Sequence, residues 1–500
     1  MILLTLAAAM AFSCMACGSG EKSPLKEAIE TYTGPHLNIR ISDAVTSLDP
    51  HNWSTDSEFT VISQIYEPLY RLADDTTEIP VLATGYTIAE DGLSCTFTIR
   101  DDVCFSNGDA LTVEDIKYSI ERQLTDSDII TSVEVNSAEF LVTLHLASPA
   151  PGIIADISTI PIISRTFAEE HGKENGSLGY SSCGTGPYVY ARHVSGESIT
   201  LTANPLYYGE PAAIETLNFL VIPDEAEAIR LLQNGSLDIA GISSDSKKLL
   251  ADDASVKTKD LPQNHVTFLV INTEKPPFDN KYIRRAISCS VNKEALNLET
   301  QQGSAVTADS MATPYMPGYS DIDPKYAYDL IHTRQLLNGC GYLDKLDIGE
   351  IQVLTDSYLS DIGAILQEQL AQADILATIT ELTAEELFNN CMNGNFGIAL
   401  MVQTNTFDMN WLSTYYSSEY IGGLNMARYS DPELDMLLSR AAVCTNPERR
   451  TALYNEILIE AEKSCAYIPI YNRSICHAWA ADLDYTPTVH TPLYSGCSRR

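Results

Sequence analysis

The spacing of hydrophobic and polar positions changes within residues 91–122. Cys95, Phe97 and Ile99 alternate with polar residues, a pattern that predicts a half-buried strand. Two aspartates follow at 101–102 and are predicted to form a turn, after which apolar residues alternate again over residues 103–105. The pattern therefore predicts a β-hairpin at this point of the chain.

A helix is predicted directly after this hairpin. Thr112 can act as its N-cap, and Asp115 stands three residues later in the capping-box position. The apolar residues that follow recur at spacings of three and four, which is typical of one buried helix face: Val113, Ile116, Ile120 and Leu124. A second amphipathic helix is predicted after residues 276–280, with Asp279 as its cap and the buried stripe Ile283, Ala286, Ile287 and Val291.

The C-terminal third alternates strand-like and helix-like segments. Strands are expected at 351–354, 375–380 and 396–402, and helices at 361–373 and 383–392. This order predicts a parallel sheet with right-handed crossovers. Ligands of such sheets bind just beyond the carboxyl ends of the strands, which here is the location of residues 403–411.

Composition limits the functional classes. A chain of 500 residues exceeds a single core, so two or three domains are expected. The formal net charge of -36 makes nucleic acid and anionic membrane surfaces poor partners for the folded body. The charge indicates a well-solvated acidic surface, with a preference for cationic ligands as the alternative.

The N-terminus reads as a targeting segment. Residues 2–12 are apolar but too short to span a bilayer, and no other segment qualifies as a membrane span. Residues 16–18 look like a bacterial lipoprotein cleavage site in which Cys17 is lipidated. The polar residues 18–35 are then a tether between the anchor and the folded body.

The cysteines do not indicate a disulfide framework or a metal site. Ten of the twelve lie beyond the N-terminal segment, from Cys95 to Cys497, with no paired metal-type spacing. In the predicted hairpin the sulfurs of Cys95 and Cys104 are too far apart to bond. Mostly free, buried thiols are expected, with one or two disulfides left open.

The sequence contains no recognisable catalytic constellation. There is no His-Glu-x-x-His or Gly-x-Ser-x-Gly segment, and no His/Cys cluster has zinc spacing. Paired glutamates at 225/227 and 385/386 are expected on solvated helix faces, and the glycines at 184 and 186 in a turn between domains. The chain is therefore interpreted as a binding protein with no cofactor and no metal, and not as an enzyme.

Several segments resemble one known family. They are residues 91–122, Leu48-Asp49-Pro50, and the stretches at 65–71, 184–188, 276–280 and 467–471. Taken in the order in which they occur along the chain, they resemble segments of the extracellular peptide-binding proteins of ABC transporters, the dipeptide- and oligopeptide-binding proteins of solute-binding family 5. The resemblance extends from about residue 37 to about residue 471.

The resemblance implies an α/β fold of the class II periplasmic-binding-protein type. Two lobes and an additional third domain are expected, with the ligand in the cleft between the lobes. The implied boundaries are 1–17 for the signal peptide, 18–35 for the tether, 36–52 with 181–265 and 472–500 for lobe I, 53–180 for the extra domain, and 266–471 for lobe II.

The resemblance also implies binding residues. Asp408 stands where the family has an Asp that holds the α-ammonium group of the peptide, although an exposed loop Asp is the alternative. The backbone of Thr404, Asn405 and Thr406 would pair with the peptide as an added strand. Asn410 and Trp411 belong to the same segment. On lobe I the corresponding loop is Trp53, Ser54, Thr55 and Asp56, in which Trp53 could instead pack in the core or at the hinge.

The function that the resemblance implies is capture of short peptides and their delivery to the permease subunits of an ABC importer. The protein is expected to be a monomer, anchored outside the cytoplasm to the cell membrane through Cys17, at the cell surface or in the periplasm. The alternatives are a nickel chelate, haem or an oligosaccharide as ligand on the same scaffold, or a peptide-sensing receptor without a role in transport.

Overall fold

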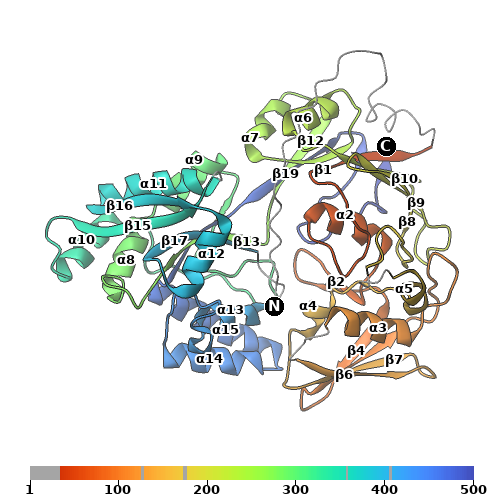
Figure 1. Ribbon diagram of the computed structural model, residues 1–500, viewed down its shortest axis with the longest axis horizontal. Coiled ribbons are helices and arrows are strands. Elements are labelled where there is room, and N and C mark those ends of the chain that lie inside the picture. The colour runs from red at the N-terminus through yellow and green to blue at the C-terminus, as the bar shows by residue number, and fades with distance from the viewer. Residues whose placement is uncertain (1–33, 125–128, 173–176, 356–357, 405–407) are drawn as a thin grey trace.

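The computed structural model describes residues 34–124, 129–172, 177–355, 358–404 and 408–500. They form three bodies, each built on its own sheet (Figure 1). We call them lobe I, lobe II and the extra domain. Within these ranges, no helix has the length and apolar character that crossing a membrane requires.

Lobe I is built on a mixed sheet of seven strands in the order β12-β19-β11-β1-β10-β9-β8. Their bounds are β1 His36–Ile41, β8 Tyr188–Val194, β9 Ser198–Ala203, β10 Thr216–Val221, β11 Ile239–Ile242, β12 Val256–Pro262 and β19 Ser474–Ala480. Helix α2 (Asp56–Ile65) packs with β1 and β10 in one core cluster, and α6 (Glu225–Gln233) packs with β11 in another. The short α7 (Ser244–Lys247) and β20 (Leu483–Asp484) with β21 (Ser498–Arg499) complete this body.

The extra domain contains a four-stranded antiparallel sheet in the order β4-β5-β7-β6. The strands are β4 Ala83–Ile88, β5 Ser94–Ile99, β6 Ile130–Asn136 and β7 Leu141–Leu146, beside the small pair β2 Tyr70–Leu72 and β3 Glu78–Pro80. Its helices are α3 Val113–Gln123, α4 Ile153–Ile157 and α5 Arg165–His171. The predicted capping box of α3 is confirmed, because Thr112 and Asp115 bond each other's backbone amides reciprocally.

The predicted hairpin at residues 101–102 is wrong. Strand β5 pairs instead with β4 and β7, so that Phe97 lies opposite Tyr86 and Val142. Residues 103–105 form no strand, and Cys104 makes only an isolated bridge to Ala110. The alternation of apolar residues predicted strand β5 correctly. It did not predict the partners of β5, of which β7 is distant in the sequence.

Lobe II is built on a six-stranded mixed sheet in the order β14-β18-β13-β17-β15-β16. The strands are β13 His265–Ile271, β14 Val306–Thr307, β15 Leu346–Leu354, β16 Ile375–Leu382, β17 Ile398–Thr404 and β18 Tyr467–Asn472. The predicted parallel arrangement is confirmed for β15, β16 and β17. It does not extend to the whole sheet, because β13 lies antiparallel to both β17 and β18.

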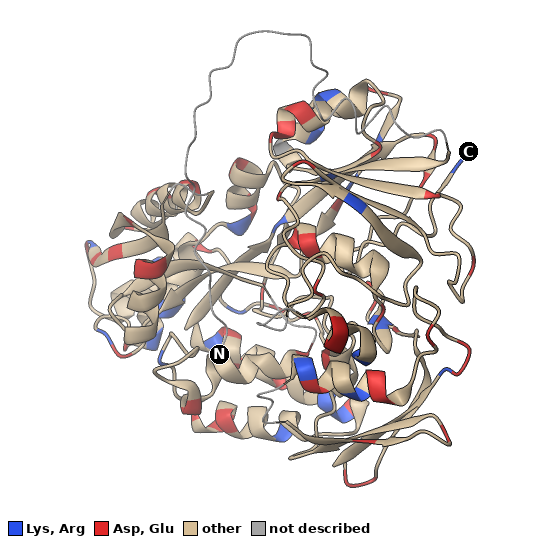
Figure 2. Ribbon diagram, turned by 45° about the vertical axis from the view of Figure 1, so that its right-hand side comes forward, with Lys and Arg blue, Asp and Glu red and all other residues tan. Residues whose placement is uncertain are grey.

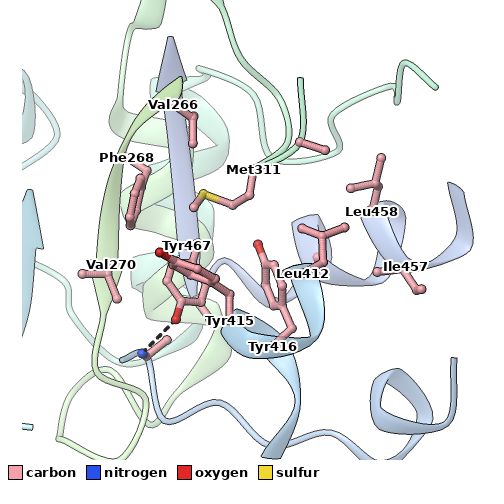
Figure 3. Packing of buried hydrophobic residues seen from close by; sticks show 14 of the residues in the cluster. Val266, Phe268, Val270, Met311, Leu412, Tyr415, Tyr416, Ile457, Leu458 and Tyr467 are labelled. Carbon is pink, nitrogen blue, oxygen red and sulfur yellow. Dashed lines mark hydrogen bonds between the residues drawn. The ribbon is translucent and has the colours of Figure 1, made fainter. Parts of the chain in front are cut away.

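Helices cover both faces of the lobe II sheet. Those of one face are α8 Lys281–Ser290, α9 Lys293–Gln301, α10 Leu330–Gly339 and α11 Tyr358–Gln372, and those of the other are α12 Ala384–Asn393, α13 Leu412–Tyr416, α14 Pro432–Ala442 and α15 Pro447–Ser464. Figure 3 shows the second core, in which Tyr467 packs between Phe268 and Tyr415, and its hydroxyl accepts a hydrogen bond from the backbone of Ala427 at 3.2 Å. The cap of α8 is Asn280 and not the predicted Asp279.

Two strand connections join the lobes. One runs from β12 through Gln263 and Asn264 into β13, and the other from β18 through Arg473 into β19 (Figure 1). The Gln263 amide donates a 2.7 Å hydrogen bond to the Arg473 carbonyl, so the two connections are tied together. This paired crossing is the hinge between the lobes.

Glycines and cysteines agree with the sequence-based predictions. A Cβ atom on Gly184 would lie 2.0 Å from the Ile65 carbonyl oxygen, so this turn needs its glycine. The ten described cysteines are free thiols, and most are buried. Acidic and basic residues are distributed along the ribbon of all three bodies (Figure 2).

Candidate functional site

The carboxyl edge of the lobe II sheet faces the hinge. Strands β15, β17 and β18 run in the same direction, and β13 begins at the edge where they end. Leu354, Thr404 and Asn472 end these three strands, and His265 starts β13. Ligands of such sheets bind beyond this edge, so these strand ends are the natural place to look for a site.

Strand β17 continues two residues further than the sequence predicted. Thr404 is its last residue and pairs with His265 on one side. On the other side, among the residues that the structure describes, β15 pairs with β17 only at Ile398 and Ala399, so none of them pairs with the last residues of β17 along this edge. Asn405 and Thr406, also predicted to pair with a peptide, lie outside the described residues, as does Cys17.

Asp408 lies where β17 leads into a short 3-10 turn (Met409–Trp411). Its carboxylate is half-buried and accepts a 3.1 Å hydrogen bond from the backbone amide of Asn410. Burial raises the pKa of Asp408, and the Asn410 amide and the nearby Arg450 guanidinium offset this only in part. The alternative of an ordinary exposed loop Asp therefore does not describe this carboxyl group.

The carboxylate of Asp408 lies against the extra domain. A Cβ atom on Gly152 would lie 2.0 Å from its Oδ2 atom, so only glycine leaves room for it. One helical turn later, Asp156 on α4 is also half-buried. Burial and the negative charge of Asp408 together raise the pKa of Asp156 to about 7. Two carboxyl groups from different bodies thus face a common space.

Groups on α15 complete the surroundings of this carboxyl pair. Arg450 and Tyr454 both lie close enough to influence Asp408 electrostatically. The Nη1 atom of Arg450 is buried and has no hydrogen-bond partner within the described ranges. The arrangement favours a cation between the carboxylates, because a positive charge would relieve both the desolvation and the mutual repulsion.

Asn410 and Trp411 follow shortly after Asp408 and hold this segment in place through hydrogen bonds. The Asn410 amide holds the Asp408 carboxylate, and the Trp411 indole donates to the Met316 sulfur at 3.4 Å. Trp411 also packs edge-on against Tyr415 in the lobe II core. The structure therefore brings Asp408, Asn410 and Trp411 together, with Trp411 facing core residues.

The predicted lobe I loop begins helix α2. Thr55 is its N-cap, and both the amide and the hydroxyl of Ser54 donate to the Glu58 carboxylate at 2.9 and 3.2 Å. Asp56 is exposed at the first helical position. Trp53 is 43% exposed, so it is not a core residue, and its ring lies 5.1 Å from that of Phe59 on α2, measured between ring centroids.

A hollow lies beside this loop, between α2, β2, the segment after α4, and the C-terminal segment. The hollow measures about 550 Å³, a volume that includes space open to solvent. It is lined mainly by apolar side chains, with a few polar ones among them: Phe59, Ile62, Ser63, Tyr66, Pro68, Arg71, Leu72, Ser158, Thr159, Pro161, His490 and Thr491. Tyr315 of lobe II meets His490 edge-on at 5.9 Å, so this wall contacts the opposite lobe.

Sequence reasoning missed Gly152, Asp156 and Arg450. The sequence signal that could have revealed them was Asp156 itself, a single carboxylate in the otherwise apolar segment Ile153–Ile157.

Over the ranges that the structure describes, no group of three or more His, Cys, Asp or Glu side chains is arranged to hold a metal ion.

Known proteins resemble this chain over most of its length. It is 26% identical to the probable di/tripeptide-binding protein 5 of Pseudomonas aeruginosa (strain UCBPP-PA14), over 79% of this chain and 81% of that protein. It is 25% identical to the heme-binding protein A of Haemophilus influenzae (strain ATCC 51907 / DSM 11121 / KW20 / Rd), over 93% of both. The solved structure of HbpA2 from Haemophilus parasuis superposes with a TM-score of 0.86 at 22% identity, covering 93% of this chain and all of that one.

The fold and the sequence agree on one family. The expected architecture of two lobes and a third domain is confirmed by the three sheets and by this structural similarity. The family profile described as "Bacterial extracellular solute-binding proteins, family 5 Middle" matches residues 77–423. This is a family of solute-binding proteins and not of enzymes. The chain belongs to the bacterial extracellular solute-binding proteins of family 5.

Proposed function

We propose that this protein captures short peptides outside the cytoplasm and delivers them to the permease of an ABC importer. The observation that carries the proposal is the carboxyl pair, Asp408 of lobe II and Asp156 of the extra domain, which face a common half-buried space. The free α-ammonium group of a peptide is the cation that such a space would accept. The relative named as a di/tripeptide-binding protein supports a peptide in particular.

The backbone of the ligand would be held without regard to its sequence. The end of β17 at Thr404 has one edge that β15 leaves open, and an extended peptide can pair with such an edge. We propose that Asn405 and Thr406 continue this pairing. On lobe I, we propose that the exposed Trp53 covers the ligand. Ser54 and Thr55 would act indirectly, because they hold the start of α2.

Anchoring and lobe closure complete the proposal. The protein would be monomeric and tethered to the membrane by a lipid on Cys17, so that closure around the ligand occurs next to the permease. Incorporation of labelled palmitate into the wild-type protein, and none into Cys17→Ser, is the expected result. Equal incorporation into both would contradict the anchor.

The ligand itself can be identified directly. Native mass spectrometry of protein purified without denaturation should show a series of adducts with the masses of short peptides. A single adduct with the mass of haem, together with a Soret band, would instead favour the alternative that the haem-binding relative suggests. A single metal complex or an oligosaccharide would likewise overturn the proposal.

A further inference from the structure

The hollow beside α2 has a largely apolar wall. One face of α2 and the chain that follows it supply its larger apolar side chains: Phe59, Ile62, Tyr66, Pro68 and Leu72. The first three recur at helical spacing and so line one side of the helix. Its volume of about 550 Å³, which includes space open to solvent, falls within the roughly 300–1,000 Å³ typical of small-molecule pockets. The hollow therefore has the size and the lining of a site for an apolar group.

Several polar groups of this lining are already paired within the protein. The hydroxyl groups of Ser63, Ser158 and Thr159 each donate to the carbonyl group three residues earlier, at 3.0, 2.6 and 2.8 Å. The guanidinium group of Arg71 forms an ion pair at 3.3 Å with the carboxylate of Glu67, which is completely buried. An apolar group can therefore replace solvent in the hollow without leaving these polar groups unpaired.

The hollow borders both of the proposed ligand contacts. On the side of the extra domain, Thr159 lies one turn after Asp156, and its hydroxyl donates to the Asp156 carbonyl. On the side of lobe I, the Phe59 ring lies 5.1 Å from that of Trp53. The α-ammonium group and the first side chain of a peptide are attached to the same carbon atom. A peptide whose ammonium group lies between Asp156 and Asp408 would therefore carry its first side chain next to the hollow.

We propose that the hollow receives the side chain of the N-terminal residue of the ligand and selects large apolar side chains, such as that of leucine. This inference rests on the proposed function, because it names the class of peptide that the same site prefers. Each buried CH₂ group raises affinity about fourfold, so the three further carbon atoms of leucine over alanine correspond to about fiftyfold when they are fully buried. A charged first side chain would be disfavoured, because it would lose its hydration in the hollow.

Calorimetric titration of the full-length protein with Leu-Ala-Ala, Ala-Ala-Ala and Ala-Ala-Leu tests this assignment. Leu-Ala-Ala should bind about ten- to fiftyfold more tightly than Ala-Ala-Ala, and Ala-Ala-Leu should gain less than Leu-Ala-Ala. The heat-capacity change on binding should also be more negative for Leu-Ala-Ala than for Ala-Ala-Ala, because this quantity reports burial of apolar surface.

Two variants fill the hollow from opposite walls. Ser63→Leu does so from α2, and Ser158→Leu does so from the extra domain. In each, the ratio of the affinities for Leu-Ala-Ala and Ala-Ala-Ala should fall to within about threefold of one, because the space for the first side chain is occupied. Ser439→Leu makes the same exchange at an exposed serine of α14, whose hydroxyl also donates to the backbone of its own helix, and should retain the full ratio.

The possible outcomes separate this inference from the proposed function. If the wild-type protein binds Ala-Ala-Ala and Leu-Ala-Ala equally, the inference fails and the proposed function stands. Tighter binding of Glu-Ala-Ala than of Leu-Ala-Ala would also overturn it, because Arg71 and not the apolar wall would then select the side chain. An unchanged ratio in both filled variants would place the side chain elsewhere. If no peptide of the series binds the wild-type protein, the proposed function and this inference fail together. Should the filled variants not fold, the wild-type series decides alone.

Discussion

Asp49 and Asp408 are carboxylates in very different surroundings. Asp49 is completely buried, and Arg122 donates two hydrogen bonds to it, at 2.8 and 2.7 Å. The backbone amides of His51 and Leu178 donate two more, at 3.1 and 3.0 Å. Burial alone would raise the pKa of Asp49, but these hydrogen bonds and the Arg122 charge hold it below its usual range.

At Asp408 the effect of burial on the pKa outweighs that of the hydrogen bond and of the nearby positive charge. The carboxylate is less buried than that of Asp49, yet burial still raises its pKa, and the facing Asp156 adds a second negative charge. The difference indicates that the Asp49–Arg122 pair stabilises the scaffold between lobe I and the extra domain. The Asp408 region instead holds two carboxyl groups whose pKa values are raised, which is the surrounding expected under the proposed role in binding an ammonium group.

The largest expected effect concerns the scaffold. Asp49→Asn should lower the free energy of unfolding by about 3–5 kcal/mol, because it removes the buried negative charge that pairs with the half-buried Arg122. Arg122→Gln should have a similar effect, and the double variant should lose less than the sum of the two. Urea denaturation followed by circular dichroism measures these changes. If Asp49→Asn were as stable as the wild-type protein, Asp49 would not be the carboxylate that stabilises the scaffold, and its contrast with Asp408 would be wrong.

The next effect depends on pH and concerns Asp156. Its pKa is raised to about 7 in the folded protein, against about 4 when unfolded, so its stabilising contribution is complete below pH 4 and lost as the pH rises to about 7. Between pH 4 and pH 8 the wild-type protein should therefore lose on the order of 3–4 kcal/mol relative to Asp156→Asn. Thermal unfolding of both proteins without ligand across this range provides the test, and parallel stability curves would refute it.

The smallest effect belongs to a local feature of the scaffold. Thr112→Ala removes the hydroxyl that caps α3, which should cost about 1 kcal/mol of stability. Thr112→Ser keeps the hydroxyl and should remain close to wild type. Neither change should alter peptide affinity, because α3 lies in the extra domain away from Asp408. A loss of affinity in Thr112→Ala at unchanged stability would show that the separation of scaffold and site is incomplete.

The periodic patterns predicted the elements of the fold better than their pairing. The stripe on α3 and the alternation in β5 follow from residues that are near one another in the chain. The error about the hairpin arose because β5 pairs with strands on both sides, which no local pattern reports. The pairing of Asp49 with Arg122 also went unseen, although both residues lie in segments that identified the family.

The candidate site was predictable on lobe II only. Asp408 follows a strand of the parallel part of the sheet, and that position could be inferred from the order of strands and helices. Asp156 and Gly152 could not be inferred in the same way, because they approach Asp408 only through packing of the extra domain against lobe II.

Calorimetry of Asp408→Asn with Ala-Ala-Ala and N-acetyl-Ala-Ala-Ala tests the central claim most directly. The substitution should cost about 2–5 kcal/mol of binding free energy for the peptide with a free ammonium group. It should change binding of the acetylated peptide little, leave the stability of the unliganded protein equal to or above that of wild type because it removes the repulsion of Asp156, and differ from the exposed control Asp252→Asn. Wild-type affinity of Asp408→Asn for Ala-Ala-Ala would contradict the assignment of Asp408 as the ammonium-binding carboxylate.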